Sequence, residues 1–151
     1  MRILITGGAG FIGSAFTRFI INSSKHNLVV LDKLTYSGDL KSLESISKNS
    51  RYSFIKGDIC DKELVSDVFL KFNPDVVVHF AAESHVDNSL AGPKIFLETN
   101  IMGTFNLLQA SLEIKKILPS FIFHHVSTDE VYGDLDFHDP RFTESSSYKP
   151  S

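Results

Sequence analysis

Residues 2–13 read Arg-Ile-Leu-Ile-Thr-Gly-Gly-Ala-Gly-Phe-Ile-Gly, a short apolar run that ends in a cluster of glycines. The β-branched, apolar run over 2–6 is typical of a buried strand. Residues 11–23 then carry apolar side chains at the spacing of one helix face. Between them the glycines match Gly-x-Gly-x-x-Gly, which permits a tight turn and lets backbone N–H groups approach a pyrophosphate at the helix N-terminus. We therefore expect a phosphate-binding turn over 7–13.

An acidic residue follows at the distance that a dinucleotide site needs. Asp32 lies 19 residues after Gly13 and ends a second apolar strand over 28–32. A carboxylate there accepts hydrogen bonds from an adenosine ribose and repels a 2′-phosphate, which favours NAD over NADP. A P-loop is excluded, because Ser14 follows Gly13 where that motif has Lys and then Ser or Thr.

The rest of the chain alternates in the same way. Further strands are expected over 52–56, 75–80 and 121–126, and helices over 39–47, from the N-cap Asp61 to Asn73-Pro74, and over 95–116. Loops are expected over 81–93 and from 132 onward. These βα repeats predict an α/β fold, a doubly wound parallel sheet of Rossmann-like type with strand order 3-2-1-4-5, incomplete at its C-terminus. We treat residues 1–151 as one such domain.

Each predicted strand ends in chemically distinctive residues, and ligands of open α/β sheets bind at that edge. Strand three ends at Asp58, which favours a contact at the adenine end of the cofactor but is also a plain helix-approach residue. Strand four ends at 81–84, Ala-Ala-Glu-Ser. Strand five ends at Thr128-Asp129-Glu130, where two carboxylates beside a hydroxyl are able to divide acid and base roles, although a solvated acidic turn explains them too.

Histidine and cysteine positions do not indicate a metal site. His124 and His125 are adjacent in a strand and point to opposite faces, so they do not clamp one ion. We interpret His79 as a core residue and His85, in the loop after strand four, as a substrate contact. Cys60 has no cysteine or histidine partner at metal spacing, and we interpret it as structural.

Composition narrows the class of protein. The chain has 151 residues, net charge −3 and a single cysteine. This length fits one domain, and the charge gives no basic excess for nucleic acid. One cysteine fits a reducing cytoplasm, and no apolar run is long enough to span a membrane. We expect a cytoplasmic protein with neither a nucleic-acid nor a membrane partner.

Several of these segments resemble the extended short-chain dehydrogenase/reductases and, within them, the nucleoside-diphosphate-glucose 4,6-dehydratases. The resemblance covers nearly the whole chain. It rests on residues 6–14, 32–36, 57–59, 81–87 and 99–101, and above all on Ser-Thr-Asp-Glu-Val-Tyr-Gly at 127–133, since the related 4-epimerases lack the Asp-Glu pair.

The resemblance implies an NAD enzyme that oxidises the hexose at C4, eliminates water across C5 and C6, and returns the hydride to C6. Glu130 is the implied base at C5, Asp129 the acid at the C6 hydroxyl, and Thr128 a hydrogen-bond partner of the sugar. Ser84 and His85 join Thr128 as implied substrate contacts. The implied cofactor contacts are Gly7, Gly10, Phe11, Ile12, Gly13, Asp32, Lys33, Leu34, Thr35, Asp58, Ile59, Ala81, Ala82 and Thr99. A nucleoside-diphosphate-glucose, with dTDP-glucose favoured but UDP-glucose open, is the implied substrate, and a homodimer the implied assembly.

One element of the family is missing. The family's Tyr-x-x-x-Lys supplies the base that starts C4 oxidation. Here only Tyr52 and Lys56 have that spacing, in predicted strand three rather than on a cleft helix. We therefore expect the chain to be a cofactor-binding portion that stops before this motif and is inactive alone. A non-catalytic NAD-binding module and a sugar-nucleotide epimerase remain alternatives.

Overall fold

A computed structural model describes residues 1–151. Its centre is a sheet of five parallel strands in the order β3-β2-β1-β4-β5, which confirms the predicted order. The strands are β1 (Arg2–Thr6), β2 (Asn27–Asp32), β3 (Tyr52–Lys56), β4 (Val76–His79) and β5 (Ile122–His125). Their carboxyl ends lie at one edge because every strand runs in the same direction.

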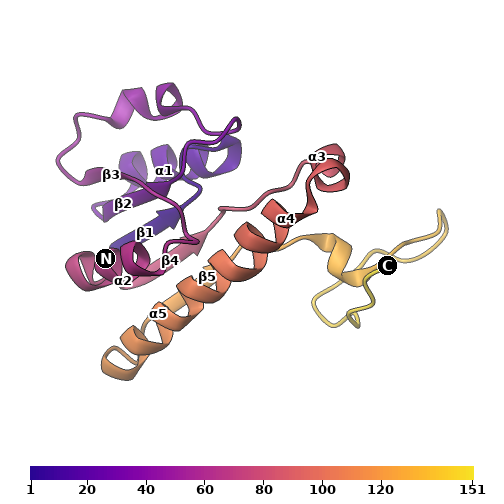
Figure 1. Cartoon of the computed structure of the whole chain (residues 1–151). Coiled ribbons are helices and arrows are strands. Elements are labelled where there is room, and N and C mark those ends of the chain that lie inside the picture. Colours follow the sequence, from indigo (N-terminus) through magenta and orange to yellow (C-terminus); the bar gives the residue numbers. More distant parts are fainter.

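Helices cover both faces of this sheet (Figure 1). On one face, α1 (Phe11–Ser23) and a 3-10 helix (Leu40–Ile46) pack over alternate residues of β1 and β2. On the other face, α2 (Lys62–Phe72) and α5 (Thr104–Ile117) pack over the remaining strand residues, such as Leu4, Val29 and Val77. Each central strand is apolar on both faces for this reason, as parallel sheets require.

Local signals fix the ends of α2 as the sequence predicts. The Asp61 side chain accepts a hydrogen bond from the N–H of Leu64 at 3.0 Å and so caps the first turn. Asn73, just before Pro74, takes a left-handed conformation with φ 48° and ends the helix. The expected stop at this dipeptide is confirmed.

The structure differs from the expectation in three helical segments. Residues 40–46 form a 3-10 helix, and the expected loop 81–93 contains a short helix, α3 (Val86–Ala91), that has no buried residue. The expected helix over 95–116 is α4 (Pro93–Phe96), a π-helical stretch (Leu97–Gly103) and α5 in continuous succession. Gly103, the last residue of the π-helical stretch, packs against Ile59, and a Cβ on it would lie 2.5 Å from Ile59 Cγ1.

After β5 the chain leaves the layered part of the molecule. A 3-10 turn (Asp129–Tyr132) follows, and the segment to the C-terminus lies to one side of the sheet and of α5 (Figure 1). The N–H of Lys149 donates to the carbonyl of Val131 at 3.0 Å, which ties this segment back to the turn. No helix in the structure is both long and apolar enough to cross a bilayer.

Candidate functional site

The turn between β1 and α1 is built from glycines, and at Gly7 the structure leaves no room for a side chain. Gly7 has φ +69°, and a Cβ on it would lie 2.5 Å from the backbone nitrogen of Ala81 at the end of β4. The N–H of Gly10 donates to the carbonyl of Gly7 at 3.2 Å, which closes the turn. The helix then begins at Phe11 with no side-chain cap, so its first N–H groups stay open to a ligand.

Asp32 holds this turn from the end of β2. One carboxylate oxygen accepts a hydrogen bond from the N–H of Ala9 and the other from the N–H of Leu34, each at 2.8 Å. The second bond supports Leu34 in a left-handed conformation with φ 57°. The carboxylate is buried, yet it lines the cavity at the strand ends. The sequence predicts Asp32 as a ligand residue, and the structure shows that it also organises the turn beside it.

Asp58 and Lys33 form an ion pair between the ends of β3 and β2. Lys33 Nζ lies 2.5 Å from Asp58 Oδ2, and Asp58 Oδ1 accepts a hydrogen bond from the N–H of Cys60 at 2.9 Å. The hydrogen bond to Asp58 raises the pKa of Lys33 above its usual value. Partial burial alone would raise the pKa of Asp58, but the bonds from Lys33 and Cys60 outweigh it and lower that pKa. Both groups are therefore charged at neutral pH.

Cys60 lies next to this pair and makes no disulfide. Its thiol donates to the backbone carbonyl of Glu98 at 3.2 Å, which links the β3 end to the π-helical stretch. Burial, and then the neighbouring Asp58 carboxylate, raise the pKa of the thiol to about 11. A thiol with this pKa is protonated and unreactive at neutral pH, which agrees with a structural role.

The residues at the carboxyl ends of the parallel strands line one cavity of about 390 Å³. Every predicted cofactor contact except Leu34 lines it, and so does the predicted substrate contact Ser84. Leu34 packs instead against the core on the α1 face. The cavity also includes residues that were not predicted as ligand contacts: Leu31, Ser37, Gly38, Gly57, Phe80, Glu83 and Val126. Ser37 and Gly38 could have been predicted, because they form the polar turn that follows Asp32 at the ligand-binding edge of the sheet.

The loop after β4 is held in place by Asn100. Its side-chain oxygen accepts a hydrogen bond from the N–H of Glu83 at 2.8 Å, and its NH₂ group donates to the carbonyl of Glu83 at 2.9 Å. This clamp fixes the backbone between Ala82 and Ser84 at the cavity. His85, in contrast, is exposed at the start of α3 and does not line the cavity.

The acidic cluster after β5 lies at a different hollow. Thr128 caps the 3-10 turn: its hydroxyl accepts from the N–H of Glu130 and donates to the Glu130 carboxylate, each at 3.3 Å. Thr128 and Asp129 line a separate cavity of about 510 Å³, together with Ser127, Val131, Tyr132, Tyr148 and Pro150. The three predicted catalytic residues are thus adjacent to one another and exposed, but they do not share the cavity of the glycine turn.

The histidines take structural positions. His79 is buried, with Nδ1 2.6 Å from the Thr6 hydroxyl and Nε2 2.9 Å from the Thr104 hydroxyl, so it joins β1, β4 and α5. Burial, and then the nearby His125, lower the pKa of His79 to about 4. The interpretation of His79 as a core residue is confirmed. No three His, Cys, Asp or Glu side chains are grouped to hold a metal ion.

A parallel sheet in which β1 turns through glycines into α1, with a buried acid at the end of β2 in the same cavity, defines a Rossmann-type fold. The profile of the family described as GDP-mannose 4,6 dehydratase matches residues 4–151. The chain belongs to this family, and the resemblance to sugar-nucleotide dehydratases is confirmed.

Individual relatives agree with that assignment. The dTDP-glucose 4,6-dehydratase of Shigella flexneri is 51% identical over 100% of this chain and 45% of its own length. The enzyme of the same name from Neisseria meningitidis is 52% identical over 99% of this chain and 44% of its own. The chain therefore spans less than half the length of these relatives.

Solved structures show the same fold. The dTDP-glucose 4,6-dehydratase DesIV of Streptomyces venezuelae, crystallised with NAD, is 43% identical with a TM-score of 0.88, over 99% of this chain and 46% of that one. A UDP-Glc/GlcNAc 4-epimerase from Campylobacter jejuni is 30% identical with a TM-score of 0.83, over 99% of this chain and 43% of that one. The fold is common to dehydratases and epimerases, so the site must separate the two activities.

Proposed function

We propose that this chain forms the NAD-binding part of a nucleoside-diphosphate-glucose 4,6-dehydratase that acts on dTDP-glucose. The proposal is carried by the cavity in which the glycine turn, Asp32 and Ser84 meet. It is supported by 51% identity, over the whole chain, to a dTDP-glucose 4,6-dehydratase.

The residues at the cavity fit NAD. A side chain at Gly7 or Gly13 would strike the backbone of the turn or of the β4 end, so these glycines keep open the approach that a pyrophosphate needs. In this proposal the Asp32 carboxylate would accept the hydroxyls of the adenosine ribose; Asp58 and Ile59 line the same cavity. Ala81, Ala82 and Thr99 complete the wall toward β4.

The chemistry divides between the cofactor and this chain's own residues. When bound, NAD supplies the hydride acceptor for C4 of the hexose and the hydride donor for C6. Glu130 removes the C5 proton, which the C4 ketone makes acidic, and Asp129 protonates the C6 hydroxyl as it departs as water. Thr128 would donate a hydrogen bond to the reacting sugar oxygen from the cavity that it lines with Asp129, and Ser84 would contact the substrate in the cavity of the glycine turn, so the proposal requires the sugar to reach both.

The base that starts C4 oxidation is not supplied by these 151 residues. Tyr52 is the first residue of β3, at the end of the sheet opposite Asp58, and neither Tyr52 nor Lys56 lines a described cavity. Burial, and then Asp32, raise the pKa of Tyr52, which is the wrong direction for a tyrosine that must lose its proton. The rejection of this pair as the catalytic motif stands.

The test is conversion of dTDP-glucose by the full-length protein, followed by mass spectrometry for the loss of one water. Glu130→Gln should stop elimination yet permit C4 oxidation, so NADH absorbance should accumulate. Glu144→Gln, at an exposed glutamate outside both cavities, is the matched control and should keep wild-type turnover. Wild-type product formation by Glu130→Gln would contradict the assigned base.

An epimerase is the second candidate, favoured by the TM-score of 0.83 to a UDP-Glc/GlcNAc 4-epimerase. An epimerase yields an isomer of unchanged mass, whereas a dehydratase loses water, so the same experiment separates them. Binding of NAD with no sugar product would instead indicate a non-catalytic module.

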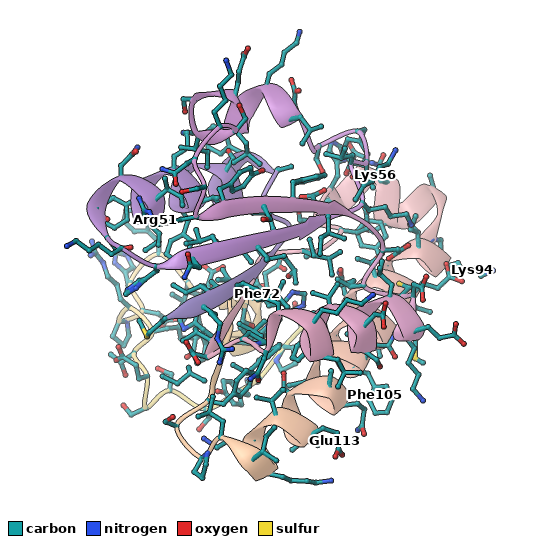
Figure 2. The ribbon with its side chains drawn as sticks, turned by 90° about the vertical axis from the view of Figure 1, so that its left-hand side faces the viewer. Arg51, Lys56, Phe72, Lys94, Phe105 and Glu113 are labelled. Atoms are coloured by element: carbon teal, nitrogen blue, oxygen red, sulfur yellow. The ribbon has the colours of Figure 1, made fainter.

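We also propose that the protein is a cytoplasmic homodimer. Exposed apolar side chains run along α4, the π-helical stretch and α5: Ile95, Leu97, Ile101, Met102, Phe105, Leu108 and Leu112. Figure 2 shows Phe105 and Glu113, which both lie on α5. Light scattering on the full-length protein tests the dimer; a monomeric mass would contradict it.

A further inference from the structure

The cavity of the glycine turn holds three acidic side chains and one basic side chain. Asp32, Asp58 and Glu83 line it, and Lys33 is the one lysine or arginine among the lining residues. Lys33 directly follows Asp32, the residue that faces the adenosine ribose in the proposed function. A cation in this position is what a dinucleotide site uses to accept the 2′-phosphate that distinguishes NADP from NAD.

In this structure the Lys33 ammonium is held by Asp58 at 2.5 Å, which fixes its position and offsets its charge. Asp58 is itself held in place. Its second oxygen accepts the N–H of Cys60 at 2.9 Å, and its backbone carbonyl accepts the N–H of Asp61 at 3.0 Å. The turn after β3 therefore presents a fixed carboxylate to Lys33 across the ends of two neighbouring strands.

We propose that Asp58 is a specificity-determining residue for the cofactor: by holding Lys33, it denies the 2′-phosphate of NADP the one cation of the cavity. This inference rests on the proposed function, since it concerns the same nucleotide site. Exclusion of NADP then has two parts. Asp32 repels the phosphate by its charge, and Asp58 keeps Lys33 from offsetting that repulsion.

Restraint of Lys33 by Asp58 and a contact of Asp58 with adenine predict different effects on cofactor affinity. If Asp58 only touched adenine, its loss would weaken NAD and NADP equally, because the adenine is the same in both. If Asp58 restrains Lys33, its loss changes the ratio of the two affinities, and the change requires Lys33. Ratios of dissociation constants therefore separate the two roles.

The experiment measures dissociation constants of NAD⁺ and NADP⁺ by calorimetry on the full-length protein. Asp58→Asn retains an oxygen that accepts from Cys60, so the turn is conserved while the ion pair is lost. The preference for NAD⁺ over NADP⁺ should fall about tenfold in this variant, because a freed ammonium near a phosphate contributes on the order of one charge-assisted bond. Lys33→Met should leave the preference at or above the wild-type value, and Asp58→Asn combined with Lys33→Met should abolish the gain.

Glu83→Gln is the matched control, since it removes the same charge from the cavity without releasing Lys33. Its effect on the preference should be much smaller than that of Asp58→Asn. An unchanged preference in Asp58→Asn, a gain that persists without Lys33, or an equal gain in Glu83→Gln would each overturn the proposal. Failure of the wild-type protein to bind NAD⁺ at all would overturn the proposed function and this inference with it, whereas NAD⁺ binding with any of the first three results overturns the inference alone.

Discussion

The carboxylate of Asp32 lies 2.8 Å from the backbone nitrogen of Ala9, so the end of β2 holds the glycine turn at the end of β1. The second oxygen of the same carboxylate accepts from Leu34. The residue that we assign to the ribose is therefore also a structural part of the phosphate turn. The proposed ribose contact and the shape of the turn therefore depend on one side chain.

Asp32→Asn should consequently destabilise the protein before any cofactor is added. An amide side chain has one acceptor oxygen, and its NH₂ group would face the other backbone donor. The free energy of unfolding should fall by about 1–3 kcal/mol, the cost of leaving a buried donor unpaired. Urea unfolding of the cofactor-free, full-length protein measures it. Asp39→Asn is the control, since exposed Asp39 accepts only from the N–H of Lys41; an equal loss in both variants would contradict the role of Asp32.

Gly103→Ala should lower the stability of the protein and its affinity for NAD⁺, because Gly103 packs against Ile59, a lining residue of the cavity. A Cβ there would lie 2.5 Å from Cγ1 and 2.6 Å from Cδ1 of Ile59, which lines the cavity. Overpacking of this kind costs about 1–3 kcal/mol, partly offset by the better helix propensity of alanine. Thermal unfolding and NAD⁺ titration should both report the change.

Two further variants test the contact between Gly103 and Ile59. Ile59→Ala deletes both clashing atoms, so adding it to Gly103→Ala should cost less than the sum of the single variants. Gly92→Ala is the matched control, because the nearest atom to its Cβ is 3.9 Å away. Strict additivity in the double variant would exclude the clash.

The order of the sheet could be predicted because the central strands are apolar on both faces, which is typical of a parallel α/β sheet, and because right-handed crossovers are the general rule for such sheets. Helix α3 could not be predicted, because it buries no residue and its sequence therefore shows no apolar periodicity. The π-helical stretch was also hidden, because a local change in residues per turn does not alter the apolar content of the helix.

At the site, the sequence identified most of the cavity residues but not how they interact. The Lys33–Asp58 pair joins residues 25 positions apart and depends on the register of β2 and β3. The sequence also predicted that all five strand ends share one site. Val126, directly after β5, lines the cavity of the glycine turn, but the chain then leaves the sheet through a turn capped by Thr128, and Thr128 and Asp129 line a separate cavity.

His79 should make the stability of the protein depend on pH between about 6.5 and 4. Burial, and then His125, lower its pKa to about 4 in the folded protein, whereas an unfolded histidine titrates at 6.5. Below 6.5 the unfolded chain binds a proton that the folded chain does not, so the free energy of unfolding falls as the pH drops and levels off below 4. The full loss is about 3 kcal/mol.

Urea unfolding at pH 7 and at pH 4.5 checks this dependence on His79. In His79→Gln the difference between the two pH values should shrink, because glutamine does not titrate while all other groups remain common to both proteins. If the wild-type protein and His79→Gln lose the same free energy on acidification, His79 is not the group responsible.

Arg51 should stabilise the connection between α1 and β2. Its guanidinium donates to the carbonyls of Ile21 at 2.8 Å, Ser24 at 2.7 Å and His26 at 3.2 Å, and so satisfies the end of the helix and the chain that leaves it. Figure 2 shows Arg51 where the chain enters β3, next to this connection. Arg51→Met removes all three bonds and should lower the free energy of unfolding by about 2–3 kcal/mol.

Arg51→Lys separates charge from geometry, because an ammonium retains the charge but not the fork that reaches three carbonyls. It should restore less than half of the loss in urea unfolding. Arg141→Met, at an exposed arginine with no hydrogen bond or ion pair in the structure, removes the same charge and should leave stability within about 0.5 kcal/mol of wild type. NAD⁺ affinity should be unchanged in folded Arg51→Met, since Arg51 does not line the cavity. Full recovery by lysine would show that charge, rather than the three carbonyl contacts, accounts for the stabilisation.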